Sequence, residues 1–276
     1  MERIHAVTFA PFCARGTFEK EETRQSLKLM KEKTGANYVI FAPNGVQKTA
    51  FSETIDYRTK RNVSDEELTA MIAYAKQLGL KVALKPTANC EDGTWRAHIN
   101  FFDEDVVCEP KWSNWFASYR AFQEHYARLA QQCGVDLFIA GCEMVQTERR
   151  EAEWREVIAA IRRRYDGLVS YNTDKYQEHN VKWWDAVDVI SSSGYYPLED
   201  WENQLDRIEA VVKKFQKPFF FAEAGCMSIV DSNKVPNDWT VQGEADVKGQ
   251  ADWYEAMFEA CLKREWVRGM AFWSWN

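Results

Sequence analysis

Short apolar runs alternate with amphipathic segments along the whole chain. Runs of this length, bounded by polar and turn-forming residues, are typical of buried strands. We therefore predict strands at residues 5–10, 38–42, 81–85, 135–140, 168–171, 187–193, 218–223 and 269–275.

The segments between most of these runs have the periodicity of amphipathic helices. We predict helices at residues 19–33, 65–78, 112–132, 150–165, 201–215 and 246–263. Ser64 is placed as an N-cap, with Glu67 in position to complete a capping box. Gly79 and Gly134 stand where two of these helices would end.

Eight strands that alternate with helices predict a (β/α)8 barrel, with residues 1–276 as one domain. A doubly wound open sheet is the structural alternative. No Gly-x-Gly-x-x-Gly follows the first strand, which weakens the dinucleotide-binding form of that alternative. The sequence stops at Asn276, directly after the eighth predicted strand, so the final helix of a barrel is missing from it.

Composition and charge narrow the class of substrate. The chain has a net charge of -7, and aromatic residues make up 14% of it, including 12 tryptophans. A protein that binds nucleic acid through phosphates needs the opposite sign of charge, so we expect no nucleic-acid partner. An acidic chain rich in aromatic residues suits a neutral substrate such as a sugar.

Cysteines and histidines show no ligand spacing. The seven cysteines are scattered without a Cys-x-x-Cys pair, and the four histidines form no ligand set, so we predict no metal and no cofactor. The N-terminal residues lack the apolar run of a signal peptide, and no stretch approaches the ~20 apolar residues of a membrane span. Free thiols are typical of a reducing compartment, so we expect a cytoplasmic protein with no membrane partner.

Two of the predicted strands end on a glutamate. The fourth, in "VDLFIAGCEM", leads to Glu143, and the seventh, in "PFFFAEAG", leads to Glu223. Active sites of (β/α)8 barrels lie at the carboxyl ends of the strands, where the fourth and seventh strands face each other across the mouth. Two facing carboxyl groups can cleave a glycosidic bond, because one protonates the leaving oxygen while the other attacks the anomeric carbon. Each glutamate could instead accept backbone hydrogen bonds or pair with an arginine.

Several longer segments carry a more specific resemblance. They are "LKPTANCEDGTWRAHI" (84–99), "WFASYRAFQEHYARLA" (115–130), "REAEWREVIAAIRRRYDG" (150–167), "WWDAVDVISSSGYYPL" (183–198) and "KPFFFAEAG" (217–225). With the two glutamates, which match clan A retaining glycoside hydrolases, these segments resemble glycoside hydrolase family 113, a family of bacterial β-mannanases and mannosidases. The resemblance implies that Glu143 is the acid/base and Glu223 the nucleophile of a retaining enzyme. Its substrate would be a manno-oligosaccharide with β-1,4 linkages, and it would need no cofactor.

The chain departs from the clan pattern beside the acid/base. The clan usually has an asparagine there, which binds the sugar 2-hydroxyl, whereas this chain has Cys142, a poor donor. We predict that Asn172, at the end of the fifth strand, takes over this contact. The segment "TANC" (87–90) also departs from the family, which more often has a histidine and an acidic residue there.

The nucleophile needs donors that keep it ionised. Tyr195 or Tyr196, at the end of the sixth strand, can supply a phenol, and the doublet leaves the choice open. We expect at least two donors around Glu223 and fewer around Glu143. Lys85, the last residue of the third strand, can donate to sugar hydroxyls or hold a glutamate charged, or form a salt bridge in the barrel mouth.

Tryptophans are the candidates for stacking on sugar rings. Trp273 and Trp275 are two residues apart on the eighth strand, so we expect both to point the same way, one of them flooring the sugar subsite. Packing in the barrel core is the alternative for either. Trp95 lies in the long loop after the third strand and is a further substrate-binding candidate.

The residues therefore predict a retaining β-glycosidase, and two alternatives stay open. The same chemistry could act on glucan, xylan or an amino-sugar glycan, or the barrel could bind carbohydrate without cleaving it. A barrel lyase or aldolase would need a Schiff-base lysine deep in the barrel, for which Lys85 is the one candidate.

Overall fold

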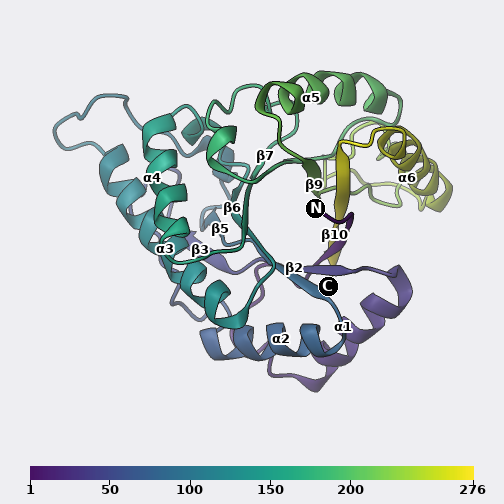
Figure 1. Cartoon of the computed structure of the whole chain (residues 1–276), viewed down its shortest axis with the longest axis horizontal. Helices are drawn as coiled ribbons and strands as arrows, with labels where there is room; N and C mark the ends of the chain where they lie inside the picture. The colour runs from purple at the N-terminus through teal and green to yellow at the C-terminus, as the bar shows by residue number, and fades with distance from the viewer.

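The computed structural model describes all residues, 1–276, and its centre is a closed barrel of eight parallel strands (Figure 1). Around the barrel the order is β1-β10-β9-β8-β7-β6-β4-β2. The strands are β1 (Ile4–Phe9), β2 (Tyr38–Phe41), β4 (Lys81–Leu84), β6 (Leu137–Cys142), β7 (Leu168–Thr173), β8 (Val189–Ser193), β9 (Phe219–Glu223) and β10 (Val267–Trp275). All eight lie where the apolar runs predicted them, and the (β/α)8 barrel is confirmed.

Helices surround the ring of strands in Figure 1. They are α1 (Glu21–Thr34), α2 (Asp65–Gln77), α3 (Trp112–Cys133), α4 (Glu151–Arg162), α5 (Trp201–Phe215) and α6 (Val247–Leu262). The capping box of Ser64 and Glu67 is formed, and Gly134 ends α3 in the left-handed conformation. Between β7 and β8 a single 3-10 turn, Trp184–Ala186, replaces the helix, and none follows β10 within these residues.

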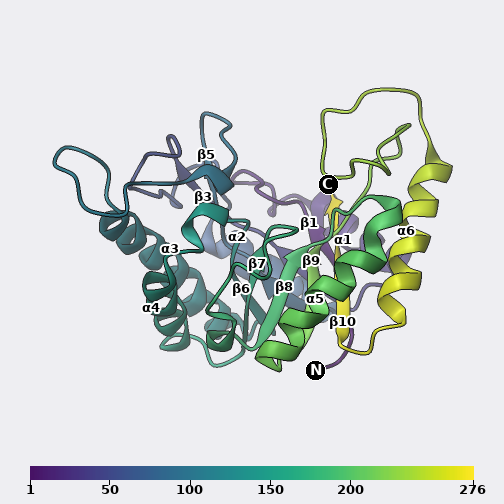
Figure 2. The ribbon, with the colours of Figure 1, turned by 90° about the horizontal axis from the view of Figure 1, so that it is seen from above.

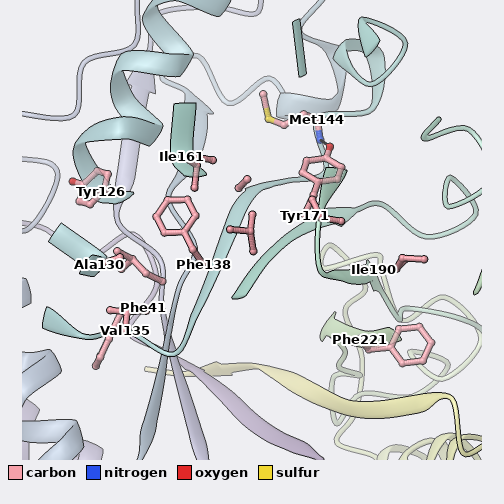
Figure 3. Close-up of a cluster of buried hydrophobic side chains, with 14 of the residues drawn as sticks. Phe41, Tyr126, Ala130, Val135, Phe138, Met144, Ile161, Tyr171, Ile190 and Phe221 are labelled. Atoms are coloured by element: carbon pink, nitrogen blue, oxygen red, sulfur yellow. Dashed lines mark hydrogen bonds between the residues drawn. The ribbon is translucent and has the colours of Figure 1, made fainter. Parts of the chain in front are cut away.

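Two apolar layers hold the barrel together. Eleven buried residues fill its interior, and a much larger cluster of 62 lies between the strands and the helices. Figure 3 shows part of the outer cluster, where Phe138 and Tyr171 point outward from neighbouring strands. Because strand side chains alternate between the two faces, each strand contributes to both layers. The polar side chains at the carboxyl ends of the strands belong to neither layer.

A second, small parallel sheet was not predicted from the sequence. Its strands, β3 (Asn44–Gln47) and β5 (Thr87–Cys90), follow β2 and β4 closely along the chain. Both are short and largely polar, so they lack the apolar run that marks a strand. Figure 2 shows this sheet at the end of the barrel opposite the N-terminus, where the long loop between β9 and α6 also lies. The sheet thus lies beside the mouth, and the loop that follows β5 carries the lining residues Trp95 and Arg96.

None of the helices combines the length and the apolar character that a membrane crossing requires.

Candidate active site

A cavity of about 440 Å³ opens at the carboxyl ends of the strands. Its charged lining residues are Arg96, Glu143, Asp174, Lys175 and Glu223. Its aromatic lining residues are Phe12, Trp95, Tyr195, Trp239 and Trp273. A concave site with aromatic walls and a few converging charged groups is the usual form of a small-molecule site.

The two glutamates face each other in this cavity. Glu143 follows β6 directly and Glu223 ends β9, and a carboxylate oxygen of each lies within 4.8 Å of the other. Both side chains are buried. The carboxyl groups of retaining glycosidases lie about 5 to 5.5 Å apart, whereas inverting enzymes need a wider gap for a water molecule. The separation here therefore fits direct attack by a carboxylate.

Glu223 is surrounded by groups that stabilise its charge. Lys85 forms an ion pair with Oε1, the thiol of Cys142 donates to the same oxygen over 3.2 Å, and the hydroxyl of Tyr195 donates to Oε2 over 3.1 Å. Burial alone would raise the pKa of Glu223, but the cations Lys85 and Arg96 outweigh it and hold this pKa below its usual value. The prediction of at least two donors is confirmed.

The prediction that Glu143 has fewer donors is wrong. Ser193 donates to Oε1 over 2.7 Å, while the indole of Trp95 and the guanidinium of Arg96 approach Oε2 at 3.2 and 3.3 Å. The difference between the glutamates lies in charge rather than in number. Lys85 contacts Glu223 alone among the carboxylates, whereas Arg96 divides its donors among Asn89, Cys142 and Glu143.

Cys142 and Asn172 have roles other than those expected. Burial raises the pKa of the Cys142 thiol well above its usual value, so it remains a donor to Glu223. Asn172 does not line the cavity, and its amide donates to Ser193 Oγ over 3.1 Å and to the Thr173 carbonyl. The predicted sugar contact of Asn172 is therefore corrected. Its side chain reaches Glu143 through Ser193.

The structure separates the two tyrosines. Tyr195 faces Glu223, while the hydroxyl of Tyr196 donates to Glu178 over 2.7 Å and its ring belongs to the outer apolar cluster. The two side chains point to opposite sides of β8's extension, so only Tyr195 reaches the cavity. The candidate Tyr196 is corrected accordingly.

The two tryptophans of β10 also point differently, and the expectation that they share a direction is wrong. Trp273 lines the cavity with its ring near Phe12 and 5.4 Å from Lys85 Nζ. The indole of Trp275 instead donates to Ser26 of α1 over 2.9 Å and packs on the outer cluster. The register with β1 shifts between Val7 and Phe9, which breaks the alternation along β10.

Trp95 lines the cavity, whereas Lys85, another predicted substrate-binding candidate, does not. Trp95 is about two-fifths exposed on the cavity wall while its indole nitrogen reaches Glu143. Lys85 is fully buried below the cavity, where its ammonium meets Glu223, so its contact is with the glutamate rather than with open space.

Besides Arg96, five lining residues were not named as candidates from the sequence. Phe12 follows β1, Asp174 and Lys175 follow β7, and Asn237 and Trp239 come from the loop before α6. Asp174 had a signal, since polar residues directly after a barrel strand reach the mouth. Burial and the charge of Glu143 raise the pKa of Asp174 to about 7. The loop residues carried no periodic signal.

One group of side chains has the composition of a metal site. Cys142, Glu143 and Glu223 each offer a ligand atom within 4.8 Å of the others. Two cations already neutralise the two carboxylates, because Lys85 pairs with Glu223 and Arg96 with Glu143. A thiol that holds its proton is also a poor ligand. The charges therefore suit proton transfer and nucleophilic attack better than binding of a divalent cation.

Two buried carboxyl groups at this spacing, in a cavity with aromatic walls at the mouth of a (β/α)8 barrel, fit the class of glycoside hydrolases, and sequence comparison agrees. The sequence model of Glycoside Hydrolase Family 113 matches residues 7–276. The chain belongs to this family, which confirms the resemblance seen in the sequence.

Solved structures support the same assignment. A structure described as a GH113 β-1,4-mannanase, and its complex, share 55% identity with this chain at a TM-score of 0.98, covering 100% of it and 89% of their own chain. A GH113 β-mannanase from Alicyclobacillus acidocaldarius in complex with ManMIm shares 40% identity at a TM-score of 0.95, covering 100% of this chain and 88% of its own. A β-glucuronidase from Ruminococcus gnavus, at 15% identity and a TM-score of 0.66, shares the fold. No curated protein matches the chain.

Proposed function

We propose that this glycoside hydrolase cleaves β-1,4 linkages in manno-oligosaccharides with retention of configuration. The observation that carries the mechanism is the buried carboxyl pair within 4.8 Å, of which only Glu223 is matched by a buried lysine. The substrate class is supported by the two family members whose descriptions name β-1,4-mannanase and β-mannanase activity.

In the first step Glu223 acts as the nucleophile. Its ionised Oε2 or Oε1 attacks the anomeric carbon, and the bond from that carbon to the leaving oxygen breaks as Glu143 transfers its proton to this oxygen. A covalent glycosyl-enzyme results. Lys85 and Tyr195 support this role because they hold Glu223 ionised before attack.

In the second step Glu143 acts as general base. It takes a proton from a water molecule, whose oxygen attacks the anomeric carbon from the side that the leaving group vacated, and the bond to Glu223 breaks. Both glutamates then return to their starting protonation states. These two steps need no redox or cofactor chemistry.

Aromatic residues supply the sugar-binding surface. Trp273 is placed to stack beneath the sugar whose anomeric carbon reacts, because it lies beside Lys85 and shares the cavity with both glutamates. Trp95 and Trp239, each partly exposed on the walls, are placed for the neighbouring sugars. We further propose one catalytic domain over residues 1–276 and a cytoplasmic location, which the seven free cysteines support.

Hydrolysis assays test this function. The purified protein is incubated with manno-oligosaccharides of increasing length and, in parallel, with cello-, xylo- and chito-oligosaccharides, and the anomeric form of the first product is followed by NMR. We expect preferential cleavage of the mannosides with the β-anomer formed first. Preference for another glycan would refute the substrate class, and first formation of the α-anomer would refute retention.

A further inference from the structure

The backbone of Glu143 adopts a conformation that a glutamate rarely takes. Its φ is +52°, in the left-handed region, directly after β6 ends at Cys142. Such a conformation costs free energy and persists only where the surroundings enforce it. It also decides where the carboxyl group of Glu143 points, so whatever enforces it acts on the site.

Strand β7 supplies the enforcing contacts. The amide of Glu143 donates to the carbonyl of Asn172 over 2.7 Å, and the next amide, of Met144, donates to the hydroxyl of Tyr171 over 3.1 Å. The first contact continues the barrel ladder, whereas the second replaces it with a side chain. Figure 3 shows the phenol oxygen of Tyr171 directed at the backbone of Met144.

The phenol of Tyr171 is itself fixed. The centre of its ring lies 4.8 Å from the ring centre of Trp154 and 4.9 Å from that of Trp183. Its hydroxyl donates to Glu148 Oε1 over 2.7 Å. Thr173 donates to the same oxygen over 2.7 Å. Because the phenol donates its hydrogen bond to Glu148, a lone pair of the phenol oxygen is left to accept from the amide of Met144.

Glu148 is a fully buried carboxyl group for which the proposed reaction has no use. It lies outside the cavity, and burial raises its pKa to about 8. A carboxyl group that stays neutral at pH 7 adds no charge behind Glu143 and works as a fixed acceptor. An amide can replace such a group, whereas a hydrocarbon cannot.

We propose that Tyr171 is a positioning residue for Glu143, with Glu148 holding its phenol in place, an inference that rests on the proposed acid/base role. Without the Tyr171 hydroxyl the amide of Met144 loses its acceptor, and the turn that aims Glu143 at the leaving oxygen relaxes. Misplacement of a reacting group by about 1 Å can cost on the order of 100-fold in rate. Only steps that need proton transfer by Glu143 should suffer.

Tyr171→Phe tests this, with Tyr165→Phe as the matched control. Tyr165 is also buried, and its hydroxyl donates to the Val135 carbonyl over 2.8 Å, away from both glutamates. We expect Tyr171→Phe to lower kcat/KM on manno-oligosaccharides about 10- to 100-fold while sparing kcat/KM on dinitrophenyl β-mannoside, whose leaving group needs no proton in the first step. Tyr165→Phe should leave kcat/KM unchanged on both substrates. Equal losses on both substrates, or no loss in Tyr171→Phe, would overturn the proposal.

A second readout does not depend on activity. Hydrogen exchange of the peptide covering residues 143–147 should be faster in Tyr171→Phe than in the wild type, and unchanged in Tyr165→Phe. Unchanged exchange in Tyr171→Phe would refute the positioning role, even if the wild type proved inactive on mannosides and the proposed function failed. Glu148→Gln, which keeps an acceptor oxygen, should retain far more of the activity on manno-oligosaccharides, relative to dinitrophenyl β-mannoside, than Glu148→Leu. Equal behaviour of these two variants would exclude Glu148 from the arrangement.

Discussion

The ammonium of Lys85 and the carboxylate of Glu223 form an ion pair inside the barrel, with side-chain exposures of 0% and 4%. Removal of one partner of a buried pair leaves the other charge unmatched. Here the unmatched group would be Glu223, the nucleophile of the proposed reaction. The pair therefore links the electrostatics of the barrel interior directly to the first chemical step.

Lys85→Met should shift the acidic limb of the pH–activity profile to higher pH. Glu223 must be ionised to attack, and its pKa is now held low by Lys85 and Arg96 against the effect of burial. Without Lys85 the effect of burial on the pKa of Glu223 is opposed less strongly. We therefore expect the acidic limb to move up by about one to three pH units. The measurement is kcat/KM against pH. The surface variant Lys81→Met, which breaks only the exposed pair with Glu2, should leave the limb in place.

Glu143→Gln and Glu223→Gln should fail in different ways. Loss of the nucleophile should abolish turnover of every substrate. Loss of the acid should cost on the order of 10²- to 10⁴-fold on manno-oligosaccharides but far less on dinitrophenyl β-mannoside, and added azide should restore turnover of Glu143→Gln with a β-mannosyl azide as product. Steady-state kinetics and product NMR check this. If both variants lost activated and natural substrates equally, the division of roles would be wrong.

The neighbouring tyrosines offer a matched pair. Tyr195→Phe removes a donor from Glu223, so it should raise the acidic limb and slow the breakdown of the glycosyl-enzyme. Tyr196→Phe removes a donor from Glu178 in the outer layer, so it should lower the melting temperature while leaving the pH profile unchanged. Pre-steady-state kinetics with an activated mannoside and thermal unfolding distinguish the two. A shifted profile in Tyr196→Phe would contradict the assignment.

The two tryptophans of β10 should likewise separate binding from stability. Trp273→Ala removes the aromatic surface beside Lys85, so we expect kcat/KM to fall by about 10-fold or more. Trp275→Ala loses the contact with Ser26 and should act on the melting temperature instead. Kinetics on mannotriose and larger manno-oligosaccharides, beside thermal melts, provide the check. Equal kinetic losses in both would show that Trp275 also reaches the substrate.

Asp174→Asn should remove a titration near neutral pH. The pKa of Asp174 is raised to about 7 by burial and by the charge of Glu143, with Lys175 Nζ 3.5 Å away as the opposing charge. Above that pH a second negative charge lies beside the acid/base. We expect an inflection near pH 7 in the wild-type kcat profile that is missing in Asp174→Asn. The surface variant Asp166→Asn, in the loop between α4 and β7, should keep it.

The sequence by itself determined the barrel and the positions of both glutamates. Apolar runs and helical periodicity are local properties, and each strand formed within a few residues of its prediction. Residues at the carboxyl ends of the strands reach the mouth of any such barrel, so Glu143 and Glu223 could be assigned to one site without coordinates. The segments that resemble glycoside hydrolase family 113 then narrowed the predicted substrate to β-1,4-linked manno-oligosaccharides.

Only the tertiary structure decided which side chains contact these two glutamates. The choice of Tyr195 over Tyr196, and of Trp273 over Trp275, depends on the direction of single side chains, and a register shift against β1 reverses the simple alternation along β10. The side-chain donors to Glu143 come from the loop after β5 and from β8, whereas β7 accepts from the backbone amides of Glu143 and Met144. These contacts join residues far apart in sequence, and no local pattern encodes a meeting that depends on how distant strands and loops pack.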